Sequence, residues 1–167
     1  LAFTERVNVG TYPSGYYSVM HLLAGDHVVW SVLAIRAANF LAFIGLSGLV
    51  WCLASRRVRS AMAVTLTTAV VPLGLFLLAS VNPSAWGVIG ISVHFFGILA
   101  LADAVGRWRP IALGVLIAVG GAMASASRGD AGAYAVAVSV IGGWLIWPAL
   151  RARPWRFLAL VLPVVLG

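Results

Sequence analysis

The sequence predicts an all-α protein: a polytopic transmembrane helix bundle of about six spans, preceded by an N-terminal interfacial helix. Three observations predict this fold: 62% of the 167 residues are hydrophobic, only 9% are charged, and the mean hydropathy is +1.04. A soluble domain is about half apolar and about a quarter charged, so this chain has too few charges to cover a water-facing surface. The composition therefore disfavours a soluble enzyme, a disordered chain and a nucleic-acid-binding protein.

The apolar residues are gathered into runs long enough to cross a bilayer, which takes about 20 residues per helix. Pro72 lies inside the second run and predicts a kink, because proline lacks the backbone N–H and clashes with the preceding turn. The last run is cut off by the end of the sequence, and we interpret the chain as a segment of a longer protein. The spans are predicted at 28–53, 61–80, 86–105, 111–125, 131–150 and from about Trp155 onward.

The segment before the first span, residues 1–27, has a different character. Thr11-Tyr12-Pro13-Ser14 is typical of a helix start, and Gly25 is typical of a helix stop. A helix between them is too short to span a membrane, so we expect an interfacial or re-entrant helix, with Asp26 capping the first span. The chain thus divides into an outer segment, 1–27, and a transmembrane bundle, 28–167.

The distribution of arginine predicts the orientation of the chain. If the spans alternate in direction, eight of the 11 basic residues share one side with a single acid, and three share the other side with three acids. Because cytoplasmic loops carry an excess of basic residues, we expect the eight in the cytoplasm and residues 1–27 outside the inner (plasma) membrane. The eight are Arg56, Arg57, Arg59, Arg107, Arg109, Arg151, Arg153 and Arg156.

Polar residues on the outer side predict one cluster that binds a substrate. Arg36 is placed about eight residues into the first span, roughly 12 Å deep at 1.5 Å per residue, where an arginine must pair, snorkel or face water. We interpret it as binding an anion such as a phosphate, with Asn39 on the same helix face. The alternative is a structural pair with Asp26 or Asp130, or simple snorkelling of the side chain to the interface. Further candidates are His21, His27 and the loops 80–84, with Asn82, and 125–130.

The tripeptide Arg128-Gly129-Asp130 is the second signal in this cluster. Arg128 could hold a phosphate, and Asp130 could hold a divalent cation or act as a base. The alternative is a simple turn in which Asp130 caps the next helix. A divalent cation is the only cofactor that these residues suggest.

Two polar residues within or next to the spans are predicted to be structural. His94, in the middle of the third span, is expected to hydrogen-bond across helices to a serine or threonine. Asp103 is expected to pair with Arg107, four residues later.

Four short segments resemble a polytopic membrane family called domain of unknown function 2142, which is common in actinobacteria. They are YPSGYY at 12–17, AIRAAN at 34–39, ASVNPS at 79–84 and SRGD at 127–130. That family resembles the C-type glycosyltransferases, which use polyprenyl-phosphate-linked sugars on the outer face and carry an acidic base or metal ligand. The resemblance implies inverting glycosyl transfer for cell-envelope glycans, with a membrane lipid as partner. The implied catalytic acids are Asp130 and Asp26, and the implied phosphate-binding residues are Arg36, Arg128, Asn39, Asn82 and His27.

Two other functions use the same residues differently. A transporter or flippase subunit for a lipid-linked or anionic substrate would use the arginines and Asp130 as a path, with Pro72 breaking a helix. A non-catalytic membrane scaffold would tolerate loss of Arg36 and Arg128.

Overall fold

The computed structural model describes residues 13–69 and 72–152, and these residues are helical with short connections. Three of the helices, α2, α5 and α6, are long and apolar enough to cross a membrane, and α7 is a shorter apolar helix. The predicted helical membrane bundle is therefore confirmed. The helices are α1 (Gly15–His21), α2 (Val28–Leu53), α3 (Arg56–Ala69), α4 (Pro72–Leu78), α5 (Ser84–Ala102), α6 (Trp108–Ser127), α7 (Ala131–Leu145) and α8 (Trp147–Ala152).

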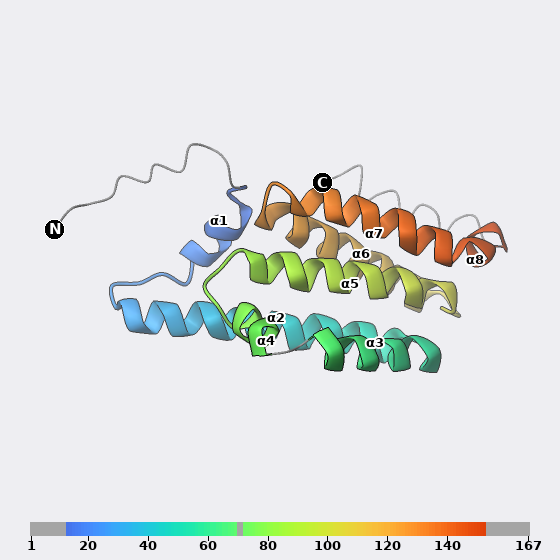
Figure 1. Cartoon of the computed structure of the whole chain (residues 1–167), viewed down its shortest axis with the longest axis horizontal. Helices are drawn as coiled ribbons and strands as arrows, with labels where there is room; N and C mark the ends of the chain where they lie inside the picture. The colour runs from blue at the N-terminus through green and yellow to red at the C-terminus, as the bar shows by residue number, and fades with distance from the viewer. Residues whose placement is uncertain (1–12, 70–71, 153–167) are drawn as a thin grey trace.

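Helix α5 forms the centre of the bundle, between the α2–α3 pair and the α6–α7 pair (Figure 1). It is apolar on every side, which is the composition of a helix buried all round. Its closest neighbour is α6, because glycines allow the two backbones to touch. A Cβ atom built on Gly90 would lie 2.5 Å from the carbonyl oxygen of Gly120, and one on Gly120 would lie 2.7 Å from that of Gly90.

A buried histidine ties α5 to both neighbouring helices. The Nδ1 atom of His94 lies 2.8 Å from the carbonyl oxygen of Ile117 in α6, and its Nε2 atom lies 2.6 Å from the Ser139 hydroxyl in α7. A carbonyl oxygen only accepts, so Nδ1 carries the proton and donates to Ile117. The predicted cross-helix hydrogen bond of His94 is confirmed.

The predicted spans differ from the helices mainly where proline occurs. The first run is α2 with the expected bounds, whereas the second is divided between α3 and α4, which begins at Pro72. The fifth run is likewise divided between α7 and α8 just before Pro148. Proline cannot donate the intrahelical hydrogen bond but suits the first turn of a helix. The run expected near Trp155 lies outside the described residues.

Helix α1 is a short helix at the place where one is expected before the first span. It is short, and its Tyr16 and Met20 are buried and pack with Ile35 of α2 and Trp86 of α5. Its first residue, Gly15, presses against Ala126 near the end of α6, where a Cβ atom would lie only 2.6 Å from that side chain. Helix α1 therefore docks on the ends of α2, α5 and α6 instead of lying apart from the bundle.

The basic residues gather at the opposite end of the bundle, as the sequence predicts. Helices α2, α5 and α7 end there and α3 and α6 begin there (Figure 1), and we call it the arginine-rich end. The side chain of Arg59 donates to the carbonyl oxygens of Trp51 and Cys52 and so closes the end of α2. The described arginines at this end are Arg56, Arg57, Arg59, Arg107, Arg109 and Arg151, and Arg153 and Arg156 lie outside the described residues.

The predicted ion pair between Asp103 and Arg107 is wrong. Asp103 accepts a hydrogen bond of 2.6 Å from the Ser55 hydroxyl, and Arg107 lies over the ring of Trp108. An i,i+4 pair requires one continuous helix, but α5 ends at Ala102 and Asp103 is its C-cap.

Candidate functional site

The centre of the polar cluster, at the end where α1 docks, is the segment 79–84, which comprises the loop between α4 and α5 (residues 79–83) and Ser84, the first residue of α5. From α2, the Nε atom of Arg36 donates to the carbonyl oxygen of Ala79 at 2.7 Å, and the Nδ2 atom of Asn39 donates to that of Ser80 at 2.7 Å. The last carbonyls of a helix have no intrahelical donor, and a cation stabilises this negative end. The two side chains therefore hold the end of α4 against α2.

Arg128, the C-cap of α6, reaches the same loop from the other side. Its Nη1 atom donates to the Ser84 hydroxyl at 3.1 Å, while Nε and Nη2 donate to the two carboxylate oxygens of Asp130 at 3.0 and 3.4 Å. The Asn82 side chain accepts from the backbone N–H of Ser84 at 2.9 Å, as asparagine side chains do in turns. We call this group the loop cluster: Arg36, Asn39, Asn82, Ser84, Arg128 and Asp130.

The loop cluster carries two guanidinium groups and one carboxylate. The hydrogen bonds from Arg128 lower the pKa of Asp130 below its usual value, so this exposed side chain is a carboxylate near neutral pH. Both of its oxygens are held by one arginine, which makes it a weaker base than a free aspartate. Asp130 is the N-cap residue of α7, but its side chain makes no capping hydrogen bond.

One part of the cluster is buried and reaches α1. Asn39 is 0% exposed, and its Nδ2 atom also lies 3.3 Å from the hydroxyl oxygen of Tyr16. Tyr16 packs edge-on against Tyr17 and Trp86, and burial raises the pKa of its hydroxyl, so it stays protonated. Sequence spacing indicates that Tyr16 is an apolar-face residue, but nothing in the sequence pairs its hydroxyl with Asn39. The role of Tyr16 in this cluster is therefore visible only in the fold.

The amide of Asn39 has a fixed orientation. Its Nδ2 atom must face the Ser80 carbonyl, which only accepts, and this leaves Oδ1 buried without a partner among the described residues. Buried polar atoms are usually hydrogen-bonded. We therefore read Asn39 as a residue that positions the loop.

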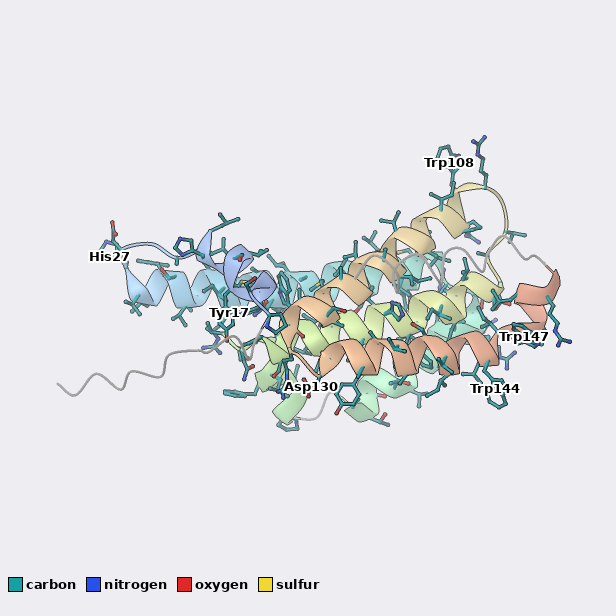
Figure 2. The ribbon with its side chains drawn as sticks, turned by 90° about the horizontal axis from the view of Figure 1, so that it is seen from above. Tyr17, His27, Trp108, Asp130, Trp144 and Trp147 are labelled. Atoms are coloured by element: carbon teal, nitrogen blue, oxygen red, sulfur yellow. The ribbon has the colours of Figure 1, made fainter. Side chains whose placement is uncertain are left out.

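The structure does not bring Asp26 and His27 to the loop cluster. Figure 2 shows His27 at the far end of α2, well away from Asp130. Helix α2 extends past the ends of α5 and α7 (Figure 1), and nine residues of helix at 1.5 Å each place His27 about 13 Å beyond Arg36. His21, at the end of α1, is exposed.

The predicted capping of the first span by Asp26 is wrong, because His27 takes the N-cap position and has no side-chain capping bond. Instead, the Ser31 hydroxyl accepts from the backbone N–H of Gly25, and this closes the turn before α2.

The described residues contain no group of three or more His, Cys, Asp or Glu side chains that could hold a metal ion. Asp130 is the carboxylate in the loop cluster, and Arg128 occupies it. The cluster is therefore suited to binding an anion through its arginines more than to binding a cation.

The comparison with protein families matches the resemblance seen in the four short segments. A family model described as "Predicted membrane protein (DUF2142)" matches residues 2–167. The chain belongs to this family. Neither a curated protein nor a solved structure matches the chain significantly. Three of the four DUF2142-like segments, at 34–39, 79–84 and 127–130, supply the loop cluster, and the fourth, at 12–17, contains Tyr16.

Proposed function

We propose that this DUF2142 protein is a membrane enzyme that transfers a sugar from a polyprenyl-phosphate carrier during assembly of the cell envelope. The observation that carries the proposal is the loop cluster, in which Arg36 and Arg128 hold one loop from two sides, next to the carboxylate of Asp130. The cluster lies at one end of a membrane bundle, where the phosphate of a lipid carrier would meet it. The apolar tail of the lipid carrier would lie between the helices. We further propose that this end faces outward and that the arginine-rich end faces the cytoplasm of the inner membrane.

Arg36 is the first phosphate ligand in this proposal. It is exposed, and only its Nε atom is engaged, on Ala79. The donors on Nη1 and Nη2 form no hydrogen bond with another described residue. A planar guanidinium with two parallel donors suits phosphate oxygens well.

Arg128 and Asp130 provide the second phosphate ligand and the base. An incoming phosphate would compete with Asp130 for Arg128, and release of the carboxylate would raise its pKa toward the usual value. Asp130 would then take the proton of the acceptor hydroxyl while the acceptor oxygen bonds to the sugar carbon. The bond from that carbon to the phosphate oxygen breaks, and Arg36 and Arg128 stabilise the charge that develops on the departing phosphate.

Asp26 has no part in this step, because it lies with His27 beyond the cluster. Asn39 and Asn82 act by holding the loop.

Binding of undecaprenyl phosphate tests the phosphate site, measured on the full-length protein by native mass spectrometry. A hydrogen bond to a charged group contributes about 1.5–3 kcal/mol, so Arg36→Gln and Arg128→Gln should each weaken binding about tenfold or more. Arg109→Gln, at the arginine-rich end, is the matched control and should not change binding. Equal binding by the wild-type protein and all three variants would reject the proposal and favour a scaffold.

The transfer step has its own test, with a polyprenyl-phosphate-linked sugar radiolabelled in the sugar. Asp130→Asn removes the competitor for Arg128 and should keep or strengthen binding of undecaprenyl phosphate, while transfer of the label is lost. Wild-type transfer by Asp130→Asn would remove this residue from the mechanism.

A transporter for a lipid-linked substrate is the second candidate, and the division of the second span supports it. Helix α4 begins at Pro72 and ends at the loop cluster, and interrupted helices near a binding site are typical of transporters. In proteoliposomes a transporter would move a fluorescent lipid-linked sugar across the bilayer with its phosphate bond intact, whereas the enzyme would cleave that bond.

A further inference from the structure

A pocket of about 280 Å³ lies at the arginine-rich end, between α3, α5 and α7. This volume is close to the lower end of the range for small-ligand sites. Its walls are mostly apolar and include Leu99 and Ile146, but two side chains of opposite charge, Arg57 and Asp103, also line it. It lies at the other end of the bundle from the loop cluster, and an inference about it does not depend on the proposed function.

The two charged side chains in this pocket do not pair with each other. They form no ion pair within 4.0 Å, which is the limit for a salt bridge, although both line the same cavity. The side chain of Arg57 makes no hydrogen bond with any other described residue. Asp103 is held by Ser55, which donates to Oδ2, and its Oδ1 atom accepts no hydrogen bond from a described residue. Arg57, which can bind an anion, and Asp103, which can bind a cation, therefore line the same cavity.

Exposed tryptophans at this end of the bundle indicate that the pocket lies near the lipid headgroups. Trp108, Trp144 and Trp147 extend from the surface at this end (Figure 2), and the first two are 75% and 74% exposed. Exposed tryptophans mark the boundary between headgroups and hydrocarbon. A molecule in the pocket would meet headgroup chemistry at Arg57 and Asp103 and hydrocarbon along Leu99 and Ile146.

We propose that this pocket binds the headgroup of a phospholipid with a primary amine, phosphatidylethanolamine. Its phosphate accepts from Arg57, its ammonium donates to Asp103, and the first methylenes of its chains lie on the apolar wall. Charge complementarity selects this lipid. Phosphatidylglycerol carries no cation for Asp103, and the quaternary nitrogen of phosphatidylcholine has no N–H to donate.

The test measures which lipid the purified full-length protein retains in native mass spectrometry, from equal amounts of these three phospholipids with identical acyl chains. The wild-type protein should retain phosphatidylethanolamine in about tenfold preference, as expected for one charge-assisted hydrogen bond. Asp103→Asn, which keeps an oxygen for Ser55, should remove this preference without reducing retention of phosphatidylglycerol. Arg57→Gln should reduce both, and Arg57→Lys should restore part of the loss.

Arg109→Gln is the matched control, because Arg109 lies at the same end but does not line the pocket. It should leave the preference unchanged, and a melting curve for each variant shows that it is folded. A wild-type preference for phosphatidylglycerol, strengthened by Asp103→Asn, would overturn the proposal in favour of a general anionic-lipid site. Equal retention of all three lipids by all variants would also overturn it, as would retention of none.

Discussion

The backbone contact between α5 and α6 gives the most quantitative prediction, and Gly90→Ala tests it. The added Cβ would lie 2.5 Å from the Gly120 carbonyl oxygen and 2.7 Å from the Ala124 nitrogen, whereas ordinary contact begins at 3.4 Å. Both neighbours are backbone atoms, so no side-chain rotation relieves the clash. The two helices must separate by about 0.9 Å at this point.

The cost follows from the packing around this crossing. A gap of 0.5–1 Å loses about a quarter to a half of each dispersion contact along the interface, and forcing extra volume into a packed core costs about 1–3 kcal/mol. The α5–α6 interface also holds the His94–Ile117 hydrogen bond, which would lengthen as the helices part. We therefore expect Gly90→Ala to destabilise the protein by about 2 kcal/mol or more.

Thermal unfolding in detergent, followed by fluorescence-detected size-exclusion chromatography, measures the effect. For a chain of this size, 1 kcal/mol corresponds to about 2–4 °C, so Gly90→Ala should lower the melting temperature by about 5 °C or more. Gly45→Ala in α2 is the matched control, because its Cβ meets nothing within 4 Å and alanine favours the helix. It should melt at or above the wild-type temperature. Equal melting temperatures for the two variants would refute the close crossing.

Three further predictions concern the loop cluster and the orientation. Because Arg128 lowers the pKa of Asp130, their ion pair should stabilise the loop above about pH 4, and this stabilisation should be lost as the pH falls through the lowered pKa. An NMR titration of the Asp130 carboxyl should give a midpoint below 3.8, and Arg128→Gln should return the midpoint to 3.8. Asn39→Ala removes the two hydrogen bonds of this buried side chain and should cost about 1–3 kcal/mol in the same melting assay. An unchanged melting temperature would contradict its positioning role. In a cysteine-free background, an impermeant maleimide should label His27→Cys in intact cells and Arg107→Cys only after permeabilisation, and the reverse pattern would invert the proposed topology.

The features predicted well from the sequence are those set by one segment at a time. A run of 26 mostly apolar residues is enough to define α2, and Pro72 is enough to divide the second span. The gathering of arginines at one end follows from alternation of the spans alone. These features depend on the bilayer thickness, on backbone chemistry and on the short range of helical hydrogen bonds, so neighbouring residues decide them.

Contacts between distant segments could not be predicted in this way. Asn39 meets Tyr16, 23 residues earlier, and Ser80, 41 residues later, and no spacing rule connects three such positions. For Asp103, the i,i+4 rule predicted Arg107 as the partner, and this was wrong because the helix ends between the two residues. The correct partner, Ser55, lies 48 residues away and is brought there by the packing of α2 and α3 on α5.

The position of Arg36 changes the argument about its chemistry. Counting from the start of the apolar run places Arg36 deep in the hydrocarbon, where a charge is costly and therefore indicates a functional role. That count assumes that the run begins at the membrane surface, but the first turns of α2 extend past the ends of α5 and α7 (Figure 1). Arg36 instead lies level with segment 79–84, and its Nε atom donates to the carbonyl oxygen of Ala79. Its claim to a functional role therefore rests on its unused donors and on Arg128 across the same loop, which the binding assay with undecaprenyl phosphate tests directly.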